Sequence, residues 1–387
     1  MNKNGTDPDP GFSSTIASPI SAGEPLALTG ISRMNRSRID QHRVLLAACA
    51  LTCLVTMRPC ASIAGREEGV HRPVPEQSGT TLDEPAGKAG PTTPGQLLSE
   101  IRIRDPFILS DRNTQTYYLV ASSGDAITVR ESKDLVTWSD PRVVFTKPAG
   151  FWGSGSIWAP EMHAYRGKFY LFATFMNDTP IGEQWQDWPP RVERGTQVMH
   201  ADSPLGPFQP FGNTPHTPVT DMALDGTMWM EEDVPYMVYC HEWVQIRDGT
   251  IELVRLTDDL SDTVGAPQLL FHASDASWTP RGRDRYVTDG PALYRSKSGK
   301  LFMLWSSFTD TGYTTGVAVS DSGKVAGPWR HHPEPLFRKD GGHAMMFRAF
   351  DGALVVSLHS PNRSPDERCQ LFEVEDTGDT LRIVRTR

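Results

Sequence analysis

Five copies of one short pattern limit what this chain of 387 residues can fold into. The clearest copy is an acidic turn, Thr288-Asp289-Gly290-Pro291, followed by two apolar strands at 292–294 and 301–305 with a polar turn between them. A turn and hairpin repeated at a fairly constant period is typical of radial architectures. The other copies, about 50 to 70 residues apart, open at Arg104-Asp105-Pro106-Phe107, Ile157-Trp158-Ala159-Pro160-Glu161, Leu224-Asp225-Gly226-Thr227 and Gly341-Gly342-His343-Ala344.

The rest of each repeat consists of short β-rich runs separated by turns, and no long helical period interrupts them. Each opening is followed by a second and a third strand, and four of the five repeats carry a further turn and outer strand. Five units of four antiparallel strands predict an all-β fold, a five-bladed β-propeller, over residues 98–387. A β-sandwich has a similar strand density but does not repeat an opening motif. The outer strands are expected at 137–140, 206–208, 265–267 and 327–329.

The first 97 residues differ in composition from the rest of the chain. Residues 1–33 are polar and without period, so we interpret them as disordered or as an over-extended start. Residues 34–65 have the order of a secretory signal, with arginines, an apolar run at 44–55 and then small residues. That run is too short to span a bilayer comfortably; a buried helix and a lipidated Cys53 are the alternatives. Residues 66–97, rich in Pro, Gly and Thr, are predicted to be a linker. We therefore expect a secreted or periplasmic protein.

Charge and cysteine content exclude several classes of function. The formal net charge is -9 and no stripe of Lys and Arg is present after the signal, so nucleic acid is not an expected partner. Only Cys240 and Cys369 remain in the predicted propeller, which excludes a disulfide framework. Two free buried thiols are expected, and a single bridge between them is the alternative. No CxxC or HExxH spacing indicates zinc.

The repeated openings predict where the chemistry lies. The innermost strands of a propeller line a central channel, so residues at their starts converge on one mouth of it. A single Asp-Pro or Asp-Gly is ordinary turn chemistry, but recurrence in several blades favours a shared site. Converging carboxylates repel, and at least one should have a raised pKa. The residues expected at this mouth are Asp105, Glu161, Asp225, Asp289 and His343.

Taken together, four motifs resemble glycoside hydrolase family 43, a family of five-bladed propeller glycosidases. The resemblance covers about residues 98–387 and implies hydrolysis with inversion at the anomeric carbon. It implies that Asp105 is the general base and that Asp225 orients the general acid and tunes its pKa. It also implies that His343 is the axial histidine that often lies beside a calcium ion or water, so a structural calcium is an expectation. The motifs are Arg104-Asp105-Pro106-Phe107-Ile108, Trp158-Ala159-Pro160-Glu161, Leu224-Asp225-Gly226-Thr227 and Asp289-Gly290-Pro291.

One departure from the family pattern concerns the general acid. Where the family usually has Glu-Gly-Pro, this chain has Asp289-Gly290-Pro291. The shorter side chain withdraws the carboxyl by about 1.5 Å, and misplacement of that size costs about a hundredfold in rate. Glu242, which follows the second strand of the third repeat, is a second candidate. Both remain open, with a slight preference for Glu242, and we expect the acid to lie about 6.5–9.5 Å from Asp105.

Aromatic residues near the openings are candidates for stacking on a sugar, although each alone is more often a core residue. The expected function is a secreted, monomeric, inverting glycosidase that removes arabinofuranosyl, xylosyl or galactosyl units from an oligo- or polysaccharide. The alternative is a sugar-binding propeller without catalysis. The loop at 176–194, with Trp185 and Trp188, is expected to shape the rim. Candidates for binding the sugar are Phe107, Trp152, Trp158, Trp229 and Trp243, together with Glu161, His163 and His241.

Overall fold

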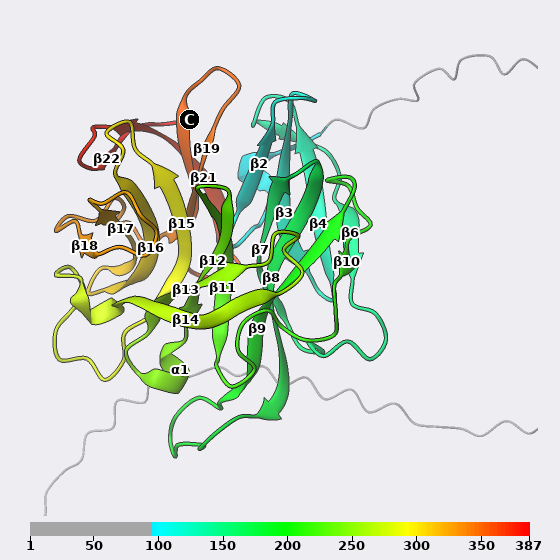
Figure 1. Cartoon of the computed structure of the whole chain (residues 1–387). Coiled ribbons are helices and arrows are strands. Elements are labelled where there is room, and N and C mark those ends of the chain that lie inside the picture. The colour runs from blue at the N-terminus through cyan, green and yellow to red at the C-terminus, as the bar shows by residue number, and fades with distance from the viewer. Residues whose placement is uncertain (1–94) are drawn as a thin grey trace, which may run out of the picture. The chain divides into compact units, whose positions relative to one another are not determined.

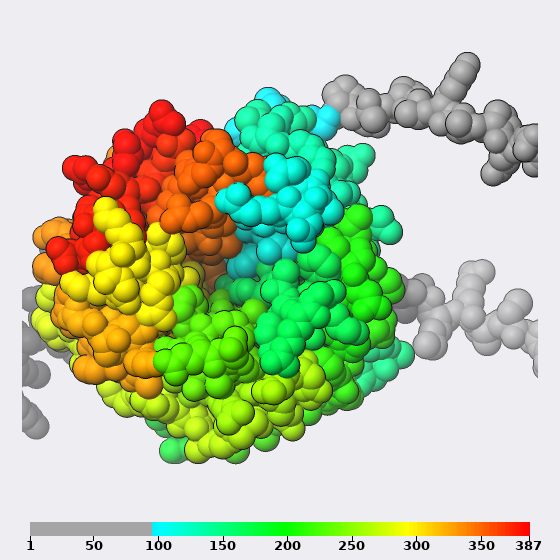
Figure 2. Space-filling view, turned by 45° about the horizontal axis from the view of Figure 1, so that its top comes forward, coloured from blue at the N-terminus to red at the C-terminus, as the bar shows by residue number. Residues whose placement is uncertain are grey.

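The structure is a computed structural model that describes residues 95–387. The predictions of an over-extended start, a secretory signal and most of the linker concern residues outside this range. The described residues form five four-stranded antiparallel sheets, so the prediction of a five-bladed β-propeller is confirmed (Figure 1). The blades surround a central hollow (Figure 2). None of the helices in residues 95–387 is long or apolar enough to cross a membrane.

Each blade is built from one continuous stretch of chain, in the order inner strand to outer strand. The first contains β2 (Phe107–Asp111), β3 (Thr116–Ser123), β4 (Ala126–Ser132) and β6 (Arg142–Thr146). The second contains β7 (Ile157–Tyr165), β8 (Lys168–Pro180), β9 (Val192–Ala201) and β10 (Gln209–Pro210). The third contains β11 (Ala223–Glu231), β12 (Val234–His241), β13 (Thr250–Leu256) and β14 (Thr263–His272). The fourth contains β15 (Asp289–Arg295), β16 (Leu301–Thr309), β17 (Gly312–Ser320) and β18 (Trp329–His331). The fifth contains β19 (Gly342–Arg348), β20 (Leu354–Ser360), β21 (Arg368–Asp376) and β22 (Leu381–Thr386).

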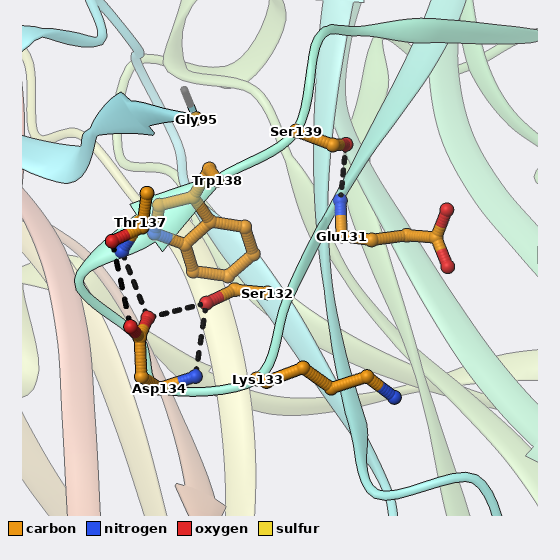
Figure 3. A pocket seen from close by; sticks show the side chains of 8 residues that line it. All are labelled: Gly95, Glu131, Ser132, Lys133, Asp134, Thr137, Trp138 and Ser139. Carbon is orange, nitrogen blue, oxygen red and sulfur yellow. Dashed lines mark hydrogen bonds between the residues drawn. The ribbon is translucent and has the colours of Figure 1, made fainter. Parts of the chain in front are cut away.

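The outer strands of the first and fifth blades differ from the sequence prediction, and those of the second and fourth, β10 and β18, begin three and two residues after the starts of the predicted segments. The segment expected to edge the first blade is β5 (Thr137–Trp138), which pairs instead with β1 (Gln96–Leu97), a strand that lies just before the predicted start of the propeller at residue 98. The cause is a turn in which Asp134 accepts hydrogen bonds from the backbone N–H groups of Val136 and Thr137 at 2.8 Å, turning the chain away from β4 (Figure 3). The edge is formed by β6, and the fifth blade has an outer strand, β22, that was not predicted.

The second strands are apolar because they lie between neighbouring blades. Residues 301–307 of β16 are all buried, so both faces of this strand are covered and it reads as a continuous apolar run. Cys240 and Cys369 are free and buried, as expected. The ring closes where residues before β2 meet the fifth blade: Arg102 pairs with Glu367 at 3.0 Å.

Short helical turns lie outside the sheets. They are η1 (Leu98–Glu100), η2 (Ala273–Asp275) and α1 (Trp243–Ile246). Of these, α1 directly follows Glu242, which comes after the second strand of the third blade. This helix therefore lies next to a residue predicted to belong to the site.

The five openings share one backbone feature. Each has a residue with positive φ, and in four of the five blades the strand register shifts across this residue. The equivalent residues are Asp105 (51°), Ala159 (42°), Asp225 (57°), Gly290 (53°) and His343 (54°). This corrects the expected equivalence of the acidic residues, because Asp289 lies one position before the shared turn and Glu161 two positions after it. The sequence motif located the turns, but only the register shows which side chain starts each inner strand.

At Gly290, in the opening of the fourth blade, both the backbone conformation and the lack of space disfavour a side chain. A Cβ atom there would lie 2.8 Å from the ring of His343, and the residue has φ of 53°. We therefore expect Gly290→Ala to lower the free energy of unfolding by about 1–3 kcal/mol, measured by urea denaturation. Gly299→Ala is the matched control, since Gly299 has φ of 86° with nothing within 4 Å of an added Cβ. Equal losses in the two variants would contradict a role for the contact with His343.

Candidate active site

Asp105 is the most strongly ionised carboxylate of the inner openings. Its Oδ1 atom lies 3.3 Å from Nδ1 of His343 and 3.2 Å from Nδ1 of His359. Burial by itself would raise the pKa of Asp105, but the imidazoles of His343 and His359 and the guanidinium of Arg104 outweigh it and hold that pKa well below its usual range. Asp105 is therefore a carboxylate at neutral pH and is available to accept a proton.

Asp225 faces the same nitrogen atom of the His343 imidazole as Asp105 does. Its Oδ2 atom is 3.8 Å from Nδ1 of His343 and accepts a hydrogen bond of 3.0 Å from the backbone N–H of Gly290. Burial, together with the charges of Asp289 and Asp105, raises the pKa of Asp225 to about 8 despite the opposing effect of His343. The pKa of His343 is raised because the carboxylates of Asp105, Asp225 and Asp289 outweigh its burial.

Asp289 is partly open to solvent and belongs to the same electrostatic cluster. Its Oδ2 atom accepts a hydrogen bond of 2.8 Å from the hydroxyl of Tyr313. Burial raises the pKa of Asp289, and the charge of Asp105 adds to this, whereas Tyr313 and His343 act against it. Asp105, with a lowered pKa, and Asp289, with a raised pKa, thus form a pair of carboxyl groups whose environments push their protonation in opposite directions.

Glu242 reaches the same region from the end of β12. Its Oε2 atom makes an ion pair with Arg194, whose guanidinium lies 4.4 Å from the ring centroid of Trp158. Burial and the charge of Asp289 raise the pKa of Glu242, and Arg194 opposes them. Trp158 is 37% exposed, which leaves aromatic surface available beside the carboxyl groups. This trio extends the cluster from the third blade towards the second.

Neighbouring blades hold the openings in place. The backbone N–H of Asp225 donates to the hydroxyl of Thr174 at 2.8 Å, and that of His343 donates to the hydroxyl of Ser306 at 2.9 Å. Thr174 lies in the middle of β8 and Ser306 in the second half of β16, the second strands of the preceding blades. His359, near the end of β20, accepts a hydrogen bond of 3.2 Å at Nδ1 from the backbone N–H of Asp105. Asp105, Asp225 and His343 are therefore each held by the blade before them in the ring, whereas Asp289 is held by Tyr313 of its own blade.

Glu161 and Phe107 lie further along the inner strands and are buried. Glu161 contacts His163 at 3.0 Å and is close enough to raise the pKa of His343. Phe107 packs edge-on against His163 with ring centroids 5.2 Å apart and is 7% exposed. These residues line the wall beneath the carboxyl cluster, and little of Phe107 is available to a sugar.

Three predicted sugar-binding residues are not in direct contact with the cluster. Trp229 lies towards the far end of β11, opposite Tyr236, with the guanidinium of Arg295 over its ring at 5.4 Å. Trp243 lies on α1 beside Glu242. His241 adjoins Glu242 in sequence, but its two ring nitrogens contact other side chains. Trp152, also a candidate for stacking on the sugar, donates a hydrogen bond of 2.5 Å from Nε1 to Oε1 of Gln197.

The described residues include one group whose composition could suit a metal ion: Asp221, His241 and Glu252. Gln245 Oε1 accepts from the backbone N–H of Met222, so Nε2 of His241, 2.9 Å away, has to donate to it. Nδ1 of His241 faces Glu252 at 3.2 Å. Burial lowers the pKa of His241, but these partners raise it overall, which favours an imidazolium without a lone pair for a metal. No comparable group of three His, Cys, Asp or Glu ligands is found around His343 in residues 95–387, and the calcium ion expected there stays a prediction.

Three residues of the cluster were not predicted: Arg194, Tyr313 and His359. Arg194 ends the loop that was expected to form the rim, so its segment was identified but its role was not. Tyr313 and His359 stack at 5.6 Å and belong to strands without a recurrent motif. His359 could have been found from its position in the repeat. Like Glu242, it lies at the end of a second strand, opposite the opening of its blade.

The fold and the cluster together define a class: a five-bladed propeller with buried carboxyl groups converging at the starts of its inner strands. The profile described as Glycosyl hydrolases family 43 matches residues 98–376. The chain belongs to this family, and its predicted resemblance is confirmed.

Individual relatives agree with this membership. A crystal structure of an endo-arabinase from Bacteroides thetaiotaomicron is 42% identical, with a TM-score of 0.67, covering 73% of this chain and 98% of that one. Alpha-L-arabinofuranosidase B from Pyricularia oryzae is 24% identical over 60% of this chain and 47% of its own length. An extracellular exo-alpha-(1->5)-L-arabinofuranosidase from Streptomyces avermitilis is 26% identical over 67% of this chain and 53% of its length. The chain thus spans about half the length of these two relatives.

Proposed function

We propose that the protein is an inverting glycoside hydrolase in which Asp105 is the general base, Asp225 the residue that orients and tunes the acid, and Asp289 the general acid. The observation that carries this proposal is the clustering of Asp105, Asp225 and Asp289 around His343 and Gly290, with the pKa of Asp105 lowered and that of Asp289 raised. An inverting glycosidase needs a carboxylate that activates water and a protonated carboxyl on the other side of the bond that breaks. The separation of about 6.5–9.5 Å between the two groups stays a prediction.

Two contacts favour Asp289 over Glu242 as the acid, against our slight preference from sequence. The pKa of both groups is raised, but the partner that opposes this at Glu242 is the full positive charge of Arg194, whereas the hydrogen bond that opposes it at Asp289 comes from the uncharged hydroxyl of Tyr313. The turn of Asp289 and Gly290 also touches Asp225 directly through the Gly290 N–H. We therefore assign Glu242 and Arg194, with Trp158, to substrate binding.

The names of the relatives reduce the number of sugars to be tested first as substrates. The names of those described above refer to arabinan and arabinofuranosyl linkages. We propose an arabinofuranosyl glycoside as the first substrate to test, followed by xylosides and galactosides. The extracellular relative also supports secretion or a periplasmic location. A monomeric state and a calcium ion near His343 remain proposals that rest on the family alone.

The function is tested by release of 4-nitrophenol from aryl α-L-arabinofuranoside, β-D-xyloside and β-D-galactoside, and of sugars from arabinan. Turnover of at least one substrate is expected. Sugar binding without any turnover would instead support the non-catalytic propeller, which the shortened acid at position 289 makes a specific alternative.

The leaving group separates the two candidate acids. Asp289→Asn should lower kcat/KM for natural oligosaccharides by about 10²–10⁴-fold, because their poor leaving oxygen needs a proton. With a 2,4-dinitrophenyl glycoside, whose leaving group departs unprotonated, the loss should be much smaller. Glu242→Gln is the matched comparison. It should lower kcat/KM for both substrates to a similar degree, since it removes a binding contact. If Glu242→Gln alone shows the dependence on leaving group, the acid is Glu242.

A further inference from the structure

Three tryptophans and two arginines form a surface beside the mouth, which we call the Trp–Arg patch. Trp185 and Trp188 come from the loop between β8 and β9, Trp243 and Arg247 from α1 and the turn after it, and Arg285 from the segment before β15. Figure 1 shows that α1 and the loop between β8 and β9 lie on the same side of the propeller. The patch begins next to the catalytic cluster, because Glu242 immediately precedes α1.

The patch is built by stacking. The ring centroids of Trp185 and Trp188 are 5.9 Å apart, and those of Trp188 and Trp243 are 5.5 Å apart. The guanidinium of Arg247 lies 4.6 Å from the centroid of Trp185 and 4.7 Å from that of Trp188. The guanidinium of Arg285 lies 5.0 Å from the centroid of Trp243. Arginine stacks well on aromatic faces, so the rings hold both guanidinium groups in position.

Backbone contacts tie the three segments together. Trp188 Nε1 donates to the carbonyl oxygen of Val244 at 2.7 Å, and Arg191 donates to the same oxygen at 3.5 Å. The backbone N–H of Tyr286 donates to the carbonyl oxygen of Arg247 at 2.8 Å. The loop before β9, α1 and the segment before β15 are therefore joined at the patch, which favours a preformed surface.

Neither arginine of the patch is neutralised within residues 95–387. Arg247 and Arg285 are exposed, and no carboxylate of the described chain lies within ion-pair distance of either guanidinium, including that of the adjacent Asp284. Arg283, in the same loop as Arg285, is by contrast paired with Asp310. Two oriented guanidinium groups with available N–H donors are suited to a planar carboxylate or a sulfate.

The backbone of Arg247 supports a role for its side chain. It has φ of 65° and ψ of -56°, and the N–H of Asp248 donates to the carbonyl oxygen of Ile246 at 2.8 Å. This is a γ-turn of the rare positive-φ kind, which is strained for any residue other than glycine. Strain of this kind collects at ligand-binding sites, where the side chain is retained despite its cost to stability.

We propose that the Trp–Arg patch binds a negatively charged group, a uronate carboxylate or a sulfate ester, on a glycan chain that extends from the mouth. This inference rests on the proposed function for the presence of a glycan at the mouth. The inference goes beyond the proposed function because it assigns a class of substrate, glycans that carry a negative charge. Arg247 and Arg285 contact the charge, and the tryptophans hold the two guanidinium groups.

Binding to the full chain is measured by isothermal titration with three probes: trigalacturonate, a sulfated carrageenan tetrasaccharide and neutral arabinotriose. At least one anionic probe is expected to bind more tightly than arabinotriose, with an affinity that falls as salt is added. Which anionic probe binds distinguishes carboxylate from sulfate. Arg247→Gly and Arg285→Gln should each weaken that probe at least about tenfold. Arg247→Gly should keep or raise the melting temperature because glycine relieves the strained turn.

Arg283→Gln is the matched control, with the same loss of charge in the same loop, and should leave binding of the anionic probe unchanged. The proposal is overturned if neither anionic probe binds more tightly than arabinotriose, or if the two patch variants bind it as the parent protein does. Hydrolysis of aryl glycosides by the same preparations tests the proposed function separately. Charge-dependent binding without hydrolysis would retain the patch and refute the enzyme, and the reverse result would refute only the patch.

Discussion

Asp105→Asn is expected to lower kcat by about 10²–10⁴-fold on every substrate, including glycosides with activated leaving groups. The carboxylate is held ionised between His343 and His359, and the amide has similar size but cannot accept a proton from water. Because attack of water is required whatever the leaving group, the loss should not depend on it. This distinguishes Asp105→Asn from the loss expected at the general acid.

Asp321→Asn provides a control for this measurement. Asp321 is an exposed aspartate paired with Arg330 on the fourth blade, away from the inner openings, and its replacement should leave kcat unchanged. The circular dichroism spectrum of Asp105→Asn should match that of the parent protein. A folded Asp105→Asn variant with full activity would remove the general base from the proposed mechanism.

Asp225→Asn is expected to abolish most activity while stabilising the fold at alkaline pH. Burial among Asp289 and Asp105 raises the pKa of Asp225 to about 8 from its ordinary 3.8. The folded protein therefore retains a proton that the unfolded chain releases between these two values. Stability falls as pH rises through this window, because ionising Asp225 in the folded state is unfavourable. Asparagine removes the titration and still offers an oxygen to the Gly290 N–H.

The size of this effect can be stated. The gain in free energy of unfolding of Asp225→Asn should be near zero at pH 4 and reach about 2–4 kcal/mol above pH 8. Urea denaturation from pH 4 to 9 measures it. His343 also loses its proton as pH rises, so the comparison is made between variant and parent at each pH. A gain that is constant with pH would show that Asp225 is not protonated in the folded state.

Much of the fold was predictable because its signal is local. Each opening has a turn that needs positive φ, followed by an apolar strand, and residues such as Asp225 and Gly290 record this requirement in the sequence. The outer strands were harder, since β5 looks like an edge strand but leaves the blade through the turn at Asp134. The prediction at 137–140 was therefore wrong for a reason that only side-chain hydrogen bonds reveal.

The site was predictable to the extent that it repeats. Asp105, Asp225, Asp289 and His343 were found from recurrence, and the structure brings them into one electrostatic cluster. Arg194, Tyr313 and His359 belong to no repeat, and their contacts depend on how neighbouring blades pack. For the same reason sequence alone did not reveal that Glu242 is paired with a cation, which changes its assignment from acid to binding residue.

The most direct test of the mechanism is the anomeric configuration of the first sugar released. Proton NMR measures this configuration immediately after the enzyme is added to an aryl glycoside that it cleaves. Water activated by Asp105 attacks from the side opposite the leaving oxygen protonated by Asp289, so the first sugar released should have the inverted configuration. Release of the sugar with its original configuration would require a covalent intermediate and would contradict this account of the site.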